Sequence, residues 1–309
     1  MTNVLGGNQY GKVENRVVRI VRDTARHEIR DLNVSTSLRG DFADAHVTGD
    51  QSAVLPTDTQ KNTAFAYAKL HGVSSPEDYA LALGRRLVEA TPAANAAQVR
   101  VEEYAWDRIS VDGPDGVQGH DHAFVRRGGE TRTCVVTVGR DETHVLSGVQ
   151  DLVVLKSTGS EFKGFLTDEF TTLPEADDRI LATSLVARWR HFDGPADWNA
   201  SYDAVRALLL ATFATTYSYA LQQSLYAMGT AVLDAHPAIA EIRFSAPNKH
   251  HFLVDFSGFA LEGTASEGLT NDGEVFHAAD RPYGLIEAQV TRADAPPAGD
   301  AWLAVPGFC

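Results

Sequence analysis

The sequence predicts an α+β fold built from antiparallel strands and segregated helices, and two observations lead to this prediction. Segments that alternate apolar and polar residues come in runs, whereas a parallel α/β fold would alternate single strands with helices. The same order of strands, helix and strands occurs in both halves, with no low-complexity linker between them. No sequence repeat relates the halves, so the expected division into residues 1–145 and 146–309 depends on architecture alone.

In the first half, a strand is expected over residues 13–24, where apolar and charged residues alternate. A second extended segment is expected over residues 62–68. A helix then begins at Ser75, a candidate N-cap, with Pro76 in its first turn. Its apolar face consists of residues spaced four apart, Tyr79, Leu83 and Leu87. Further extended segments are expected over 99–109, 123–127 and 131–138, with a flexible Gly-containing loop over 110–119.

In the second half, a strand is expected over residues 179–190. Residues 202–235 are expected to be helical, with a break near 215–218 and Pro237 just beyond the end. The remaining expected segments are strands over 241–256 and 287–292 and a polar, Gly-containing insertion over 261–273.

Composition limits the possible functions. The chain has 309 residues, 44% of them hydrophobic, which is ample for a large buried core. Its formal net charge of -14 argues against nucleic acid or an anionic membrane as a partner. The two cysteines, Cys134 and Cys309, have neither disulfide-framework nor metal-ligand spacing. Without a membrane-spanning stretch or signal-peptide pattern, a soluble cytoplasmic protein is expected.

Motifs for common cofactors are missing from the sequence. No Gly-rich phosphate loop and no nucleophile elbow is present, so nothing in the sequence supports a nucleotide or flavin enzyme. The pattern most typical of a metal site is His120-Asp121-His122, because in an extended segment His120 and His122 share a face. The alternative is an ordinary polar loop end.

The segment 247–252, PNKHHF, interrupts an apolar strand with polar residues. In one continuous strand, Asn248 and His250 would share a face, and Lys249 and His251 would point the other way. An Asn beside a His inside a sheet can hold a polar ligand and move a proton. The alternative is a solvated strand face.

Several short motifs follow one another along nearly the whole chain. They are NQYGK (8–12), TDTQKN (57–62), KSTGSEF (156–162), DRILAT (178–183), LQQSLY (221–226), PNKHHFLVD (247–255) and DRPYGLIEA (280–288). Each is ordinary by itself, but the ordered set resembles the urate oxidases, and most closely those of actinobacteria. The resemblance implies two tandem tunnelling-fold units, each an antiparallel sheet with helices on one face. It further implies four chains in a hollow barrel, with active sites at subunit interfaces.

The resemblance also assigns roles to residues. The implied catalytic residues are Lys12, Thr57 and His250. The implied substrate and oxygen site consists of Thr57, Asp58, Phe162, Arg179, Leu221, Gln222 and Asn248. Leu221 stands where many members have valine. The implied reaction is the oxidation of urate by O2 and water to 5-hydroxyisourate and hydrogen peroxide in purine catabolism, with no metal and no cofactor.

These residue types suit a flat, electron-rich anion. Phe162 offers a ring for stacking, while Arg179 and Gln222 offer donors and an acceptor to opposite edges of the purine. Lys12 would remove a proton through Thr57 if burial lowers its pKa.

Two alternatives belong to other classes. One is a metal-dependent pterin or purine enzyme on the same fold that uses His120, His122 and His250. The other is a non-catalytic purine-binding protein, for which the pair Lys12 and Thr57 would be superfluous.

Overall fold

The computed structural model describes residues 3–114, 116–258 and 270–307. In chain order its elements are β1 (Tyr10–Val21), β2 (Glu28–Gly40), α1 (Ala43–Val47), α2 (Thr57–Leu70), α3 (Pro76–Ala90), β3 (Ala94–Glu103), β4 (Trp106–Gly113), β5 (Gly116–Arg126), β6 (Thr131–Gly139), β7 (Thr143–Lys156), β8 (Leu181–His191), α4 (Trp198–Thr215), α5 (Leu221–Ala235), β9 (Ile239–Pro247), β10 (His250–Leu253), β11 (Phe276–Ala279) and β12 (Leu285–Thr291).

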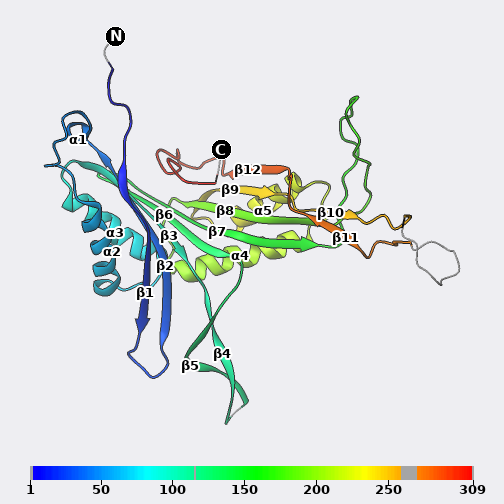
Figure 1. Cartoon of the computed structure of the whole chain (residues 1–309), viewed down its shortest axis with the longest axis horizontal. Helices are drawn as coiled ribbons and strands as arrows, with labels where there is room; N and C mark the ends of the chain where they lie inside the picture. The colour runs from blue at the N-terminus through cyan, green and yellow to red at the C-terminus, as the bar shows by residue number, and fades with distance from the viewer. Residues whose placement is uncertain (1–2, 115, 259–269, 308–309) are drawn as a thin grey trace.

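Eight strands form one antiparallel sheet in the order β1-β2-β3-β6-β7-β8-β9-β12. The pairs β4–β5 and β10–β11 are separate two-stranded ribbons, and β4–β5 extends well away from the main sheet (Figure 1). This arrangement confirms the predicted α+β class with antiparallel strands. The strands of the two halves are continuous in one sheet.

The helices of both halves pack on the same face of this sheet. One core of buried apolar side chains joins α2 and α3 to β1, β2, β3 and β6, and a second joins α4 and α5 to β8, β9 and β12. The two cores meet in β7, where Val145 belongs to the first and Val149 to the second. The boundary expected at 145/146 lies inside this strand and stays a prediction.

Residues 301–307 cover part of the opposite face of the sheet. There Val305 and Trp302 pack against Val135 and Leu146. Apolar groups thus cover both faces of the sheet centre, which explains why eight of the nine residues of β6 are buried.

The predicted helix after Ser75 is confirmed in detail. The Ser75 hydroxyl accepts a hydrogen bond from the backbone N–H of Asp78 at 3.0 Å, and Pro76 is the first helical residue. The predicted apolar residues of α3 are all buried. The break predicted near 215–218 is also confirmed, because α4 ends at Thr215 and α5 begins at Leu221.

The extended segment expected over residues 62–68 is wrong, because this segment lies inside α2. Period-2 alternation of alanines with larger residues suggested a strand, but alanine is the strongest helix former. The buried residues of α2 are spaced by four, Gln60, Ala64 and Ala68. That spacing places all three residues on one face of the helix, and this face packs against the sheet.

Other expected boundaries also change. The strand expected over 99–109 is divided between β3 and β4, and most of the expected loop 110–119 belongs to the β4–β5 hairpin. The strand expected over 241–256 is divided between β9 and β10. Strands β2 and β7 were not predicted. Most of the insertion over 261–273 lies outside the described residues.

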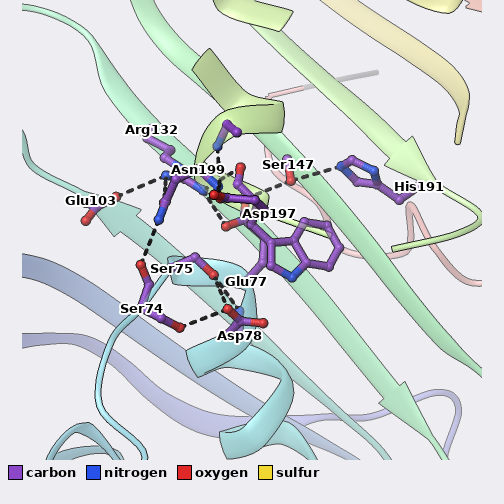
Figure 2. A network of polar contacts seen from close by, with 12 residues as sticks. Ser74, Ser75, Glu77, Asp78, Glu103, Arg132, Ser147, His191, Asp197 and Asn199 are labelled. Atoms are coloured by element: carbon purple, nitrogen blue, oxygen red, sulfur yellow. Dashed lines mark hydrogen bonds and ion pairs between the residues drawn. The ribbon is translucent and has the colours of Figure 1, made fainter. Parts of the chain in front are cut away.

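A buried polar network joins the two halves (Figure 2). Glu77 of α3 accepts from Arg132 of β6 at 2.7 Å and from the hydroxyl of Ser147 of β7 at 2.7 Å. Arg132 also donates to Asn199 of α4 at 2.7 Å, and the Nε2 atom of His191 lies 3.2 Å from the Ser147 hydroxyl. Burial lowers the pKa of His191 to about 3, so this imidazole is neutral at physiological pH.

Candidate active site

One group of predicted site residues lies where β1 meets the start of α2. Lys12 is in β1, and Thr57 and Asp58 are the first two residues of α2, after Pro56. The Asp58 carboxylate pairs with Lys61, whose hydrogen bond is the main cause of a lowered Asp58 pKa. The Lys12 charge lowers the same pKa further, so Lys12 lies within electrostatic reach of the α2 N-terminus.

A second group of predicted site residues, Phe162, Arg179, Leu221 and Gln222, lies around the starts of β8 and α5. Backbone hydrogen bonds connect these segments. Arg179 N–H donates to Ser160 O at 2.7 Å, and Glu161 N–H donates to Ser218 O at 2.9 Å. The guanidinium carbon of Arg179 lies 4.9 Å from the centroid of the Phe162 ring. In α5 the first residue, Leu221, is buried and the second, Gln222, is exposed.

Asn248 and His250 lie next to the second group. Asn248 forms an isolated antiparallel β-bridge with Thr183 of β8, and Thr183 follows Arg179 by four residues in the chain. His250 stacks on Phe252, with ring centroids 5.6 Å apart. The pKa of His250 is lowered, first by burial and then by the charge of Arg179, so Arg179 lies within electrostatic range of His250.

The register assumed for the segment 247–252 is correct only in part. His250 and Phe252 do share a face, but the chain leaves β9 after Pro247 and starts β10 at His250. Lys249 N–H donates instead to Ala182 O of β8 at 2.8 Å. His250 and His251 both line one hollow of about 180 Å³, so simple alternation does not separate them.

Arg179 is a half-buried cation with a hydrogen-bond donor left unsatisfied by the described residues. Burial lowers its pKa, which means that the protein has removed part of the water around a charged group. Its Nε atom is buried and has no hydrogen-bond partner among the described residues. A buried donor without a partner is costly, so a ligand with matching acceptors would restore a favourable contact.

The two groups do not meet within one chain. Strand β1, which carries Lys12, is at one edge of the sheet, and β8 is five strand spacings away. At roughly 4.8 Å per spacing the separation is on the order of 24 Å. One small ligand therefore cannot touch Thr57 and Arg179 of the same chain.

The hypothesis of a metal centre on the β4–β5 ribbon receives no support. His120 and His122 meet edge to face, with ring centroids 4.5 Å apart, and His122 N–H donates to His120 Nδ1 at 3.2 Å. In the described ranges there is no group of three or more His, Cys, Asp or Glu side chains that could hold a metal ion. His250 belongs to the other ribbon, β10–β11.

Buried polar residues lie beneath both groups, and they were not predicted from the sequence. Ser218 and Ser224 hydrogen bond at 2.8 Å beneath the start of α5, and Thr36 and Gln60 hydrogen bond at 2.9 Å beneath the start of α2. Gln60 lies in the motif TDTQKN, one turn after Thr57, and that position was the available signal.

In the described residues, no helix is long and apolar enough to cross a membrane.

Fold and site together define an α+β protein with antiparallel strands in which a half-buried guanidinium lies over an aromatic ring. The uricase family model matches residues 8–137 and 145–287. The chain is 48% identical to the uricase of Arthrobacter globiformis over 306 residues, which are 99% of this chain and 96% of that protein. It is 37% identical to the rabbit (Oryctolagus cuniculus) uricase over 290 residues, with 92% and 93% covered.

Solved structures agree with these similarities. The crystal structure of the Arthrobacter globiformis uricase superposes with a TM-score of 0.89 at 48% identity, covering 98% of this chain and 99% of that one. The chain belongs to the uricase family.

Proposed function

We propose that this protein oxidises urate with O2 and water to 5-hydroxyisourate and hydrogen peroxide, as a step of purine catabolism and without a metal or organic cofactor. Membership of the uricase family supports urate oxidation. The observation that carries the proposal is the half-buried guanidinium of Arg179 over the ring of Phe162, because this pair suits a flat anion.

The proposed binding roles follow from the chemistry of each group. Phe162 stacks on the purine ring, and the planar fork of Arg179 binds adjacent carbonyl and nitrogen acceptors at one edge. Gln222, exposed at the start of α5, offers a donor and an acceptor to the opposite edge. Leu221 and Asp58 complete this site.

The proposed proton chemistry involves the first group. Urate gives up an electron to oxygen more readily after it loses a further proton, and Lys12 removes that proton through the Thr57 hydroxyl. His250 tunes or relays the proton, since its lowered pKa keeps the imidazole neutral at physiological pH. Asn248 and Thr57 hold oxygen, peroxide or water above the ring. The substrate itself is the reductant in this scheme.

We further propose a homotetrameric barrel with active sites at subunit interfaces. The separation of Lys12 from Arg179 within one chain supports this, because a second chain must then complete the site. In the described part of the chain, β1 and β12 have no further strand beside their outer edges. Edges of this length pair readily with another chain. We likewise propose two units divided at 145/146 and a cytoplasmic location.

The test is loss of urate absorbance together with oxygen uptake and peroxide release, measured on chelator-treated protein. We expect full activity without added metal, flavin or nicotinamide, and strongly reduced activity in Lys12→Met. A requirement for one bound metal per site would refute the cofactor-free scheme and restore the metal-dependent alternative. Purine binding without turnover would restore the binding-protein alternative.

A further inference from the structure

A buried hydrogen bond connects the sheet to α2 directly beneath the predicted proton-transfer pair. The Thr36 hydroxyl, in β2, donates to the Oε1 atom of Gln60, in α2, at 2.9 Å. Thr36 is 1% exposed and Gln60 is fully buried. The Gln60 amide nitrogen makes one further contact, with Leu55 O at 3.4 Å, just before the helix. We call Thr36 and Gln60 the buried clamp.

On the strand side, the clamp lies beside Lys12. Lys12 and Thr36 are directly opposite each other in the antiparallel pair β1–β2. Directly opposite residues of such a pair have their side chains on the same face of the sheet, here the face covered by α2. The Thr36 hydroxyl is also 3.5 Å from the Lys12 carbonyl oxygen.

On the helix side, the clamp is one turn from Thr57. Residues three apart lie on the same side of a helix, so Gln60 and Thr57 are neighbours on the first turns of α2. The other buried residues of this face, Ala64 and Ala68, are small and apolar. Gln60 is therefore the polar anchor of the part of α2 that carries Thr57.

Strand β1 is irregular beside Lys12. The pairing of β1 with β2 shifts register between Lys12 and Asn15, and Glu14 in that bulge has a φ of 58°. The strands also approach closely at Gly11, where an added Cβ would lie 1.8 Å from Thr36 O. Within the strand pair, the Glu14 N–H donates to the Ser35 hydroxyl of β2 at 3.0 Å. A bulge re-aims the side chains beside it, so the direction of the Lys12 side chain depends on this irregular pairing.

We propose that Thr36 and Gln60 are positioning residues that hold the first turn of α2 against β1, and thereby keep the Thr57 hydroxyl within reach of the Lys12 amine. This inference rests on the proposed roles of Lys12 and Thr57. A buried polar pair is costly to desolvate, whereas two apolar side chains would fill the same space. The hydrogen bond adds a fixed position of α2 relative to β2.

The test compares Thr36→Val and Gln60→Leu, which remove the hydrogen bond while keeping similar side-chain volumes. Because proton transfer depends steeply on geometry, we expect each to lower kcat for urate at least about tenfold. Xanthine, a purine related to urate, serves as the probe of binding. Its dissociation constant should change less than about twofold, since Arg179 and Phe162 are untouched. Thr36→Ser keeps the hydroxyl and should retain kcat. The double variant should be no slower than the slower single variant, because the two residues act as a unit.

The matched control is Tyr79→Phe. The buried Tyr79 hydroxyl, in α3, donates to Ala64 O of α2 at 2.8 Å, so its loss also removes one buried hydrogen bond that holds α2. Ala64 is one turn further along α2 than Gln60 and seven residues after Thr57, so Tyr79→Phe should leave kcat within about twofold of the unmodified protein. An equal loss of kcat in Tyr79→Phe would mean that the clamp only stabilises the fold.

Lys12→Met, measured in parallel, separates failure of this inference from failure of the proposed function. If Lys12→Met is inactive while Thr36→Val and Gln60→Leu keep normal kcat, the positioning role is wrong and the role of Lys12 stands. If Lys12→Met keeps normal kcat, the proposed proton chemistry is wrong and the positioning role falls with it. Should Gln60→Leu not fold, Thr36→Val against Thr36→Ser decides the question.

Discussion

Subunit complementation tests the proposal that each active site is shared between two chains. Thr57→Ala and Arg179→Ala each disable one of the two groups, which are on the order of 24 Å apart within a chain. In hetero-oligomers formed at random from equal amounts, a site is intact when the Arg179→Ala chain supplies Thr57 and the Thr57→Ala chain supplies Arg179. That combination has a probability of about one quarter, so about a quarter of wild-type activity should return.

The two variants are co-expressed with different tags, and hetero-oligomers are purified through both tags before the rate of urate loss is measured. The matched control combines Thr57→Ala with Lys12→Met. Both changes affect the same group, so every site lacks one of the two residues and no activity should return. Absence of recovery with the Arg179→Ala partner, or equal recovery in the control, would show that the shared site is wrong.

Arg179→Ala should weaken binding of xanthine at least tenfold by calorimetry, because a lost charge-assisted contact costs roughly 1.5–3 kcal/mol; unchanged affinity would remove Arg179 from the site. Arg132→Met should lower the free energy of unfolding in urea by about 3–5 kcal/mol, since it leaves the fully buried Glu77 without its cation; a loss below about 1 kcal/mol would contradict this. His191 has a folded pKa of about 3, below its unfolded value of about 6.5, so its contribution to stability is present above pH ~6.5 and is lost as pH falls. Between pH 7 and 5.5 this loss should be about 1.2 kcal/mol, and urea titrations at the two pH values should show that His191→Asn lacks it.

Features that depend on neighbours along the chain were predictable from the sequence. The start of α3 followed from Ser75 and Pro76, because a cap needs only a side-chain oxygen and a backbone N–H three residues away. The period of the apolar residues was a less reliable guide. The alternating alanines of residues 62–68 suggested a strand, but they belong to α2. Tertiary packing selects which face of a helix is buried. The spacing by four of Gln60, Ala64 and Ala68 became meaningful only against the sheet.

By itself, the sequence determined the α+β class, the two helices of the second half and, through its ordered motifs, the family. These properties are encoded in local patterns and residue identities. Only the tertiary structure decided which of these residues are neighbours. It turned the chain away from β9 between Pro247 and His250, placed Lys12 and Arg179 far apart, and buried Thr36 against Gln60. The physical reason is that strand order and helix packing bring together residues distant in sequence, and no local pattern specifies that pairing.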